Sequence, residues 1–152
     1  MPLCNAVRLI APLVLLLATA LHARADGGTT AEAQAMVAKA IALYRERGPA
    51  AFDVMNRGEQ GFLDRDLYIF VIGPDNRTVV HAADNSRIGA DLSGTTDAEG
   101  TPFGKAIIEQ ASADGAWVDY KWPNPATGAV EAKSSWVVRY EGYIFGCGVY
   151  TP

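Results

Sequence analysis

Apolar residues follow a helical period in the part of the chain that begins at residue 29. Thr29 and Glu32 form a capping box, in which each side chain bonds the other residue's backbone amide at the start of a helix. Gly48 and Pro49 end the run, since a glycine followed by a proline commonly ends a helix. Between them, apolar residues recur three or four positions apart, at Ala33, Met36, Val37, Ala40, Ile41 and Tyr44. The pattern predicts one long helix, followed by a shorter helix at residues 50–56.

The period then changes to that of β-strands. Residues 67–72 (LYIFVI) are apolar on both faces and end at GPDNR, which is typical of a turn. Residues 78–83 (TVVHAA) are predicted to pair back as a hairpin. Residues 84–100 are rich in Gly, Asp, Ser and Thr, have no period and predict a loop. Residues 101–113 predict a short helix, because Pro102 stands just inside its start.

Three more strands are predicted at residues 117–122, 130–139 and 143–150. An order of helices, hairpin, loop with helix, and antiparallel meander is typical of an α+β domain. We expect a single domain with its helices on one face of an antiparallel sheet of about five strands.

Residues 1–25 predict a signal peptide. The first eight residues carry one basic residue, residues 9–20 (LIAPLVLLLATA) are apolar, and Ala23-Arg24-Ala25 offers small residues where a signal peptidase cleaves. The alternative is an uncleaved anchor, but a membrane-spanning helix needs about 20 apolar residues. We expect cleavage near Ala25 and a periplasmic or secreted domain of residues 26–152 that has no membrane span after cleavage.

Composition narrows the function. Removal of Arg8 and Arg24 lowers the 13 basic residues to 11 against 17 acidic ones, and the formal net charge moves from −4 to −6. An acidic chain binds the phosphates of nucleic acids poorly, so we expect no nucleic-acid partner. The remaining chain has one cysteine, Cys147, and one histidine, His81. These exclude an intramolecular disulfide and a zinc site of clustered Cys and His residues, and we expect no cofactor.

The acidic residues of the predicted loop do not form a known calcium motif. They are Asp84, Asp91, Asp97 and Glu99. Their spacing differs from D-x-[DN]-x-[DN]-G with a distal Glu, so we interpret the segment as a solvated loop without a metal.

Several segments together resemble a known family. They are DLYIFVIGPDNRTVVHAADNSRIGADL, DAEGTPFGKAIIEQASADGAWVDYKWPNP, KSSWV and FGCGVY. In this order they resemble the single Cache domain, the PAS-like extracytoplasmic sensor module of bacterial chemoreceptors and sensor kinases. The likeness covers almost all of the predicted mature chain. It implies a long N-terminal helix on one face of a central antiparallel sheet and a ligand pocket on the other face.

The resemblance also implies a function, which is binding of small organic acids of two to four carbons without catalysis. Two features depart from the family pattern. The sequence has no second apolar span and no output region, which leads us to expect signalling through a partner such as a membrane receptor, kinase or transporter. The family's His-Pro is replaced by His81-Ala82, which affects the rim of the pocket.

Lys133 stands where a strand should enter the core. Either its stem lies on the sheet while its ammonium reaches solvent, or it faces a cavity that holds an anion. The resemblance favours the second alternative, because this lysine matches the family's strand lysine that faces a carboxylate. Ser135 shares its face, since side chains alternate along a strand.

Four further residues are candidates for ligand contacts. Tyr120 and Trp122 are either core residues or the walls of a pocket for a short acid. His81 is either structural or a donor to the anion, and Tyr68 is a similar candidate through its hydroxyl. The complete predicted ligand site is therefore Tyr68, His81, Tyr120, Trp122, Lys133 and Ser135.

The remaining distinctive residues are assigned to structure. We place Trp117 and Trp136 in the core and interpret Cys147 as a small buried residue. The flanking Gly146 and Gly148 are expected to allow a helix or another backbone to approach closely. Two alternatives to ligand binding stay open: an interaction module whose pocket is filled with side chains, and an enzyme acting on a small organic acid.

Overall fold

The computed structural model describes residues 27–151, so the predicted signal peptide lies outside the described residues. The helices are α1 (Thr30–Arg47), α2 (Ala51–Asn56) and α3 (Phe103–Gln110), with short 3-10 helices η1 (Gly48–Ala50), η2 (Glu59–Gly61) and η3 (Asn85–Arg87). The strands are β1 (Leu63–Asp64), β2 (Leu67–Ile72), β3 (Thr78–His81), β4 (Ala116–Pro123), β5 (Val130–Tyr140) and β6 (Tyr143–Thr151). Within this part of the chain, no helix is both long and apolar enough to cross a membrane.

The first helix begins and ends as its sequence predicts. The Thr29 hydroxyl accepts a hydrogen bond from the Glu32 amide at 3.2 Å, and the Glu32 carboxylate accepts one from the Thr29 amide at 2.8 Å. At the other end, Gly48 has a φ of 58°, which favours glycine at the end of a helix. The residues that α1 buries are Ala33, Met36, Val37, Ala40, Leu43 and Tyr44.

The strands form one antiparallel sheet in the order β1-β2-β6-β5-β4, with β3 also paired to β2. β1 pairs with Leu67 and Tyr68, whereas β3 pairs from Phe70 onward, so both lie along the same edge of β2. β6 lies in the centre, between β2 and β5. Although β6 is the last of the described strands, it joins the hairpin of β2 and β3 to the strands β5 and β4.

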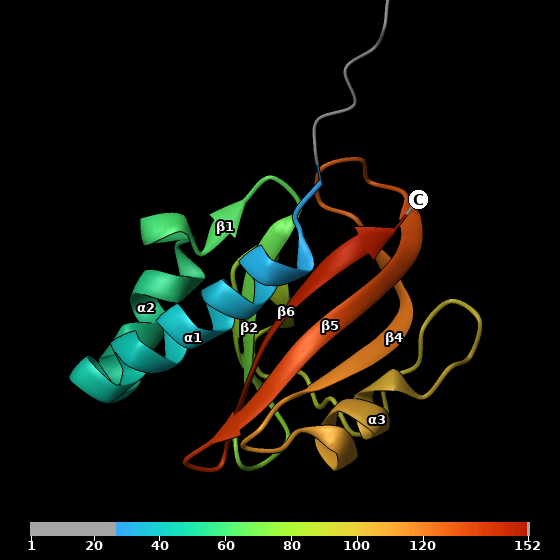
Figure 1. Ribbon diagram of the computed structural model, residues 1–152. Coiled ribbons are helices and arrows are strands. Elements are labelled where there is room, and N and C mark those ends of the chain that lie inside the picture. Colours follow the sequence, from blue (N-terminus) through green and yellow to red (C-terminus); the bar gives the residue numbers. More distant parts are fainter. Residues whose placement is uncertain (1–26, 152) are drawn as a thin grey trace, which may run out of the picture.

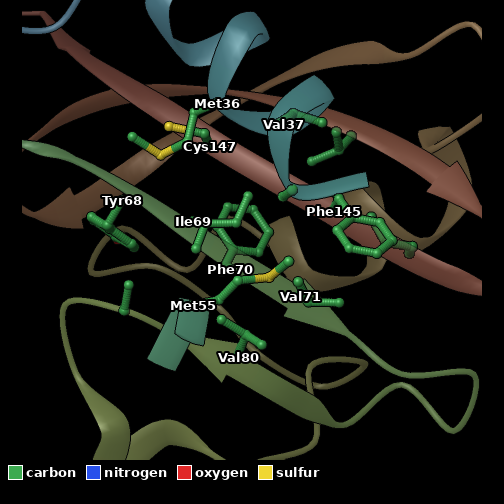
Figure 2. Packing of buried hydrophobic residues seen from close by; sticks show 14 of the residues in the cluster. Met36, Val37, Met55, Tyr68, Ile69, Phe70, Val71, Val80, Phe145 and Cys147 are labelled. Carbon is green, nitrogen blue, oxygen red and sulfur yellow. The ribbon is translucent and has the colours of Figure 1, made fainter. Parts of the chain in front are cut away.

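The helix α1 crosses one face of the sheet over β6, β5 and β2 (Figure 1). Figure 2 shows Met36 and Val37 of α1 in one packed group with Cys147 and Phe145 of β6. Ile69 and Phe145 on this face are both 0% exposed. Cys147 is buried here as predicted, and the layer is the main hydrophobic core.

The structure confirms the α+β class and departs from the expected elements in four places, one of which is the short 3-10 helix η2, which was not predicted. The two-residue strand β1 was not predicted, because two exposed residues carry no period. The loop contains η3, whose start is capped by Asp84 through the Ser86 amide. The helix α3 packs against β4 on the face opposite α1, so the helices do not all lie on one face.

Trp117 and Trp136 lie at the margin of the core rather than inside it. They pair across β4 and β5, with ring centroids 5.3 Å apart. Trp136 is in register with Cys147 on the face that α1 covers. Both rings are half-buried, so their assignment to the core is correct only in part.

Candidate functional site

The face of the sheet opposite α1 bounds a cavity of about 60 Å³. Its walls come from β2, β3 and β4, from α3, and from the segment of residues 87–95 between them. Its aromatic and basic lining residues are Tyr68, Phe70, His81, Arg87, Phe103, Tyr120 and Trp122.

Lys133 is buried directly behind this cavity, with 2% of its surface exposed. Its ammonium donates a hydrogen bond to the Tyr68 hydroxyl at 2.6 Å. It also lies 3.9 Å from the centre of the Tyr68 ring and 4.9 Å from that of Tyr150. Among residues 27–151, no carboxylate lies within 4.0 Å of the ammonium. The lysine therefore does not reach solvent, and its charge has no ion-pair partner in the described part of the chain.

Burial lowers the pKa of Lys133 to about 7, because removal from water penalises the charged ammonium. Electrostatic interactions with Cys147 and Asp66 act in the opposite direction and raise it. An anion that comes close to Lys133 would stabilise the charged form of its ammonium.

The two glycines of β6 make room for side chains of neighbouring strands. A Cβ atom built on Gly148 would lie 2.1 Å from Cε of Lys133, and one built on Gly146 would lie 2.1 Å from Cζ of the Phe70 ring. The expectation that a helix or backbone approaches these glycines is therefore wrong. They let the lysine stem and the phenylalanine ring lie flat against the central strand.

Tyr120 and Ser135 form a second buried pair. Their hydroxyl oxygens are 2.8 Å apart across β4 and β5. On the cavity side, the Phe103 ring stacks on Tyr120 with centroids 4.3 Å apart and an interplanar angle of 11°. Trp122 meets the same Phe103 ring edge-on at 5.1 Å. The three rings make a continuous apolar wall from α3 to β4.

His81 lines the cavity from β3 and is 8% exposed. Its backbone is held by Asn56, which accepts from the His81 amide and donates to the Val79 carbonyl, both at 3.0 Å. Its Nδ1 atom is buried and has no hydrogen-bond partner among residues 27–151. Burial, together with the nearby charges of Lys133 and Arg87, lowers the pKa of His81 to about 4. The imidazole is therefore neutral at pH 7 and has an unsatisfied polar atom.

Arg87 is a cavity residue that the sequence analysis missed. Its guanidinium lies 4.3 Å from the centre of the Trp122 ring and forms an ion pair with Asp84 at 3.2 Å. No sequence signal pointed to it, because a single basic residue in an aperiodic loop has no predictable direction. The fold brings it to the cavity through η3.

The structure therefore sorts the six predicted site residues into two groups. Tyr68, His81, Tyr120 and Trp122 line the cavity. Lys133 and Ser135 are absent from its walls and contact the hydroxyls of the two lining tyrosines from behind.

The acidic loop residues serve mainly as caps for backbone amides. Asp84 and Asp91 accept from the amides two residues further on. Asp97 differs from the expected solvated residue, because it is 8% exposed and accepts from the amides of Glu99, Thr101 and Lys121. It thereby ties the loop to β4. Within residues 27–151, no group of His, Cys, Asp and Glu side chains could hold a metal ion.

A long N-terminal helix on one face of an antiparallel sheet, with a lined cavity on the other, defines a PAS-like sensory domain. The chain belongs to the single Cache domain 2 family, whose model matches residues 11–151. Domains of this family are extracytoplasmic sensors, and this chain is similar to those of chemoreceptors and sensor kinases.

Two curated relatives match part of the chain. The sensor histidine kinase MctS of Rhizobium johnstonii is 34% identical over 88 residues, which are 57% of this chain and 19% of the kinase. The methyl-accepting chemotaxis protein McpP of Pseudomonas putida is 29% identical over 90 residues, 57% of this chain and 16% of the receptor. The chain thus aligns with less than one fifth of the length of either relative.

Solved structures share the fold. A methyl-accepting chemotaxis protein of Vibrio parahaemolyticus superposes with a TM-score of 0.67 and 18% identity, over 79% of this chain and 86% of that one. A periplasmic sensor domain of a chemotaxis protein superposes with a TM-score of 0.65 and 26% identity, over 80% of this chain and 94% of that one. A Cache chemosensory domain described for carboxylic acid recognition superposes with a TM-score of 0.57 and 20% identity, over 80% of this chain and 88% of that one.

Proposed function

We propose that this domain is a periplasmic sensor that binds a short organic carboxylate and passes its state to a partner protein. The observation that carries the proposal is Lys133, a buried ammonium next to a cavity, with no carboxylate within ion-pairing distance in the described residues. A buried charge without a counterion is costly, and a small anion would supply that counterion.

Two other groups at the cavity favour an anion. Arg87 reaches it from η3 with a guanidinium, a group suited to paired hydrogen bonds with a carboxylate. His81 brings a polar atom that has no partner. The positive charge of Lys133 and Arg87 on this side of the sheet, with an imidazole that can donate from Nδ1 in one tautomer, fits a ligand that is negative and accepts hydrogen bonds.

The size and walls of the cavity support a short acid. At about 15 Å³ for each water-sized group, the volume of about 60 Å³ accommodates about four such groups, which is the size of acetate. Tyr120, Trp122 and Phe103 offer apolar surface for a methyl or ethyl group. An open cavity also supports ligand binding over the alternative of a pocket filled with side chains.

The comparisons support the same class of ligand and the same role. One fold neighbour is described for carboxylic acid recognition, which makes carboxylic acids the first class to test. The family is one of sensory domains, and one fold neighbour is the periplasmic sensor domain of a chemotaxis protein. We propose that the signal peptide of residues 1–25 directs export, and that a membrane receptor, kinase or transporter reads the bound state.

Calorimetric titration of the refolded protein with acids of two to four carbons tests the proposal. Refolding removes any acid carried through purification. We expect saturable binding of one acid per chain, weakened at least about tenfold by Arg87→Gln, because a hydrogen bond to a charged group contributes about 1.5–3 kcal/mol. Lys121→Met is the control, because it removes a positive charge from β4 at a residue outside the cavity walls. It should leave the affinity for the acid unchanged.

A flat titration of well-folded protein with every acid would overturn the proposal and direct attention to protein partners. Consumption of an acid in the same samples would instead reveal an enzyme.

A further inference from the structure

The hydroxyl of Tyr68 has a proton without a good acceptor in the described part of the chain. Its oxygen accepts the hydrogen bond from Lys133 at 2.6 Å, and its proton must therefore point elsewhere. The nearest acceptor is the Tyr150 hydroxyl, 3.5 Å away, which itself donates to the Pro123 carbonyl at 2.8 Å. A separation of 3.5 Å is long for a bond between two hydroxyls, whose usual distance is about 2.7–2.8 Å. The Tyr68 proton is therefore available to a group in the cavity that Tyr68 lines.

The Lys133 ammonium is separated from the cavity by the same residue. Lys133 does not belong to the cavity walls, whereas Tyr68 does. Its stem is pressed onto Gly148, and its ammonium lies against the rings of Tyr68 and Tyr150. An anion in the cavity therefore meets Tyr68, whereas Lys133 lies outside the walls and donates to the Tyr68 hydroxyl.

We infer that the Tyr68 hydroxyl donates directly to the carboxylate, and that Lys133 acts behind it as a positioning residue that orients and polarises the hydroxyl. This inference rests on the proposed function and assigns separate roles to two residues of that site. A hydroxyl that accepts from a cation becomes a stronger donor, because hydrogen bonds in a chain polarise one another at low dielectric. The arrangement brings positive charge to the anion without stripping the ammonium of its own acceptor.

A double-mutant cycle with acetate distinguishes this relay from direct contact. The four proteins are the wild type, Tyr68→Phe, Lys133→Met and the variant with both substitutions, all titrated calorimetrically. In the relay, Tyr68→Phe removes the donor and weakens acetate binding about 10-fold to 100-fold. Lys133→Met acts through the same hydroxyl and weakens binding by less. The double variant then binds no more than about twofold more weakly than Tyr68→Phe alone.

Direct contact predicts a different pattern. If Lys133 touches the anion, its charge still acts when Tyr68 is replaced, and the losses multiply in the double variant. Multiplying losses would overturn the relay while the carboxylate-binding function stands. Absence of acetate and propionate binding to the wild type would overturn the proposed function, and the relay would fall with it.

A spectroscopic measurement covers the case in which Tyr68→Phe does not fold. In protein labelled with ¹³C at the tyrosine Cζ atom, acetate should shift the Tyr68 resonance in the wild type and shift it less in Lys133→Met. Tyr143, outside the cavity walls, is the internal control and should not shift. An unshifted Tyr68 resonance in acetate-saturated protein would overturn the relay, since a hydroxyl that donates to the carboxylate must sense the ligand's charge.

Discussion

The two faces of one sheet have opposite chemistry in this protein. On the face that α1 covers, Ile69, Val71 and Phe145 are 0% exposed and pack against apolar side chains. On the other face, the alternate residues of the same strands are Tyr68 and Phe70, and the paired strand β5 contributes Lys133. The first face is closed and apolar, whereas the second has a cavity, a buried cation and an unsatisfied imidazole nitrogen.

The comparison indicates where stability and binding reside. Apolar packing stabilises a fold without any need for a partner. Buried polar groups that lack partners reduce stability unless something else satisfies them. We infer that the face under α1 holds the domain together, and the proposed function assigns to a ligand the task of satisfying the groups of the opposite face.

The largest effect is expected from an alanine at the centre of the closed face. Phe145→Ala should lower the free energy of unfolding by about 3–5 kcal/mol, because it removes a ring that is 0% exposed and leaves a cavity. Val130→Ala is the control, since Val130 is 53% exposed and surface changes usually stay within about 0.5 kcal/mol. Urea denaturation measures both. Equal, small losses in the two variants would contradict the assignment of the core.

A smaller loss is expected from an added methyl group on the binding face. In Gly148→Ala the new Cβ would lie 2.1 Å from Cε of Lys133 and 2.4 Å from Oγ of Ser135. Overpacking of this kind costs about 1–3 kcal/mol. Displacement of the lysine should also weaken acid binding. Gly94→Ala, where nothing lies within 4 Å, is the matched control in both denaturation and titration.

Per pH unit, the smallest effect expected is a pH dependence that arises on the binding face. The pKa of Lys133 is about 7 in the folded protein, below its ordinary value of 10.5. Between these values the unfolded chain binds more protons, so the free energy of unfolding rises with pH across this window. A bound anion favours the charged ammonium, so above pH 7 binding of the acid is accompanied by uptake of a proton. As the pH rises above 7, the affinity for the acid therefore falls by up to about tenfold per pH unit.

Calorimetry in buffers of different ionisation enthalpy measures this proton uptake. The charged or titratable groups around the ammonium are Asp66, Tyr68, His81, Arg87, Tyr120, Cys147 and Tyr150. If proton uptake on acid binding persists in Lys133→Met, the proton is taken up by one of these neighbours and not by Lys133.

The sequence predicted the elements well where local rules act strongly. The capping box at Thr29 and the glycine at Gly48 predicted the bounds of α1, and alternation along β5 placed Lys133 and Ser135 on one face. Alternation gives the face of a side chain and not its depth. Lys133 lies behind Tyr68 because Gly148, which has no side chain, leaves space for the lysine stem. This space exists only when β5 and β6 pair.

The parts that were missed are those set by contacts between distant segments. Arg87 reaches the cavity because a short 3-10 turn aims it at Trp122, 35 positions away in the chain. Asp97 is buried because β4 offers it the Lys121 amide. Neither contact leaves a periodic pattern in the sequence.

The most direct test of the account is to locate a bound acid on the sheet. We would record intermolecular nuclear Overhauser effects between methyl-labelled ¹³C-acetate and the aromatic protons of the refolded protein. The account predicts contacts to the cavity rings of Phe70, Phe103 and Trp122, with none to Tyr44 or Phe145 beneath α1. Contacts confined to residues outside the cavity, or none at saturating acetate, would contradict the claim that the face opposite α1 binds a carboxylate.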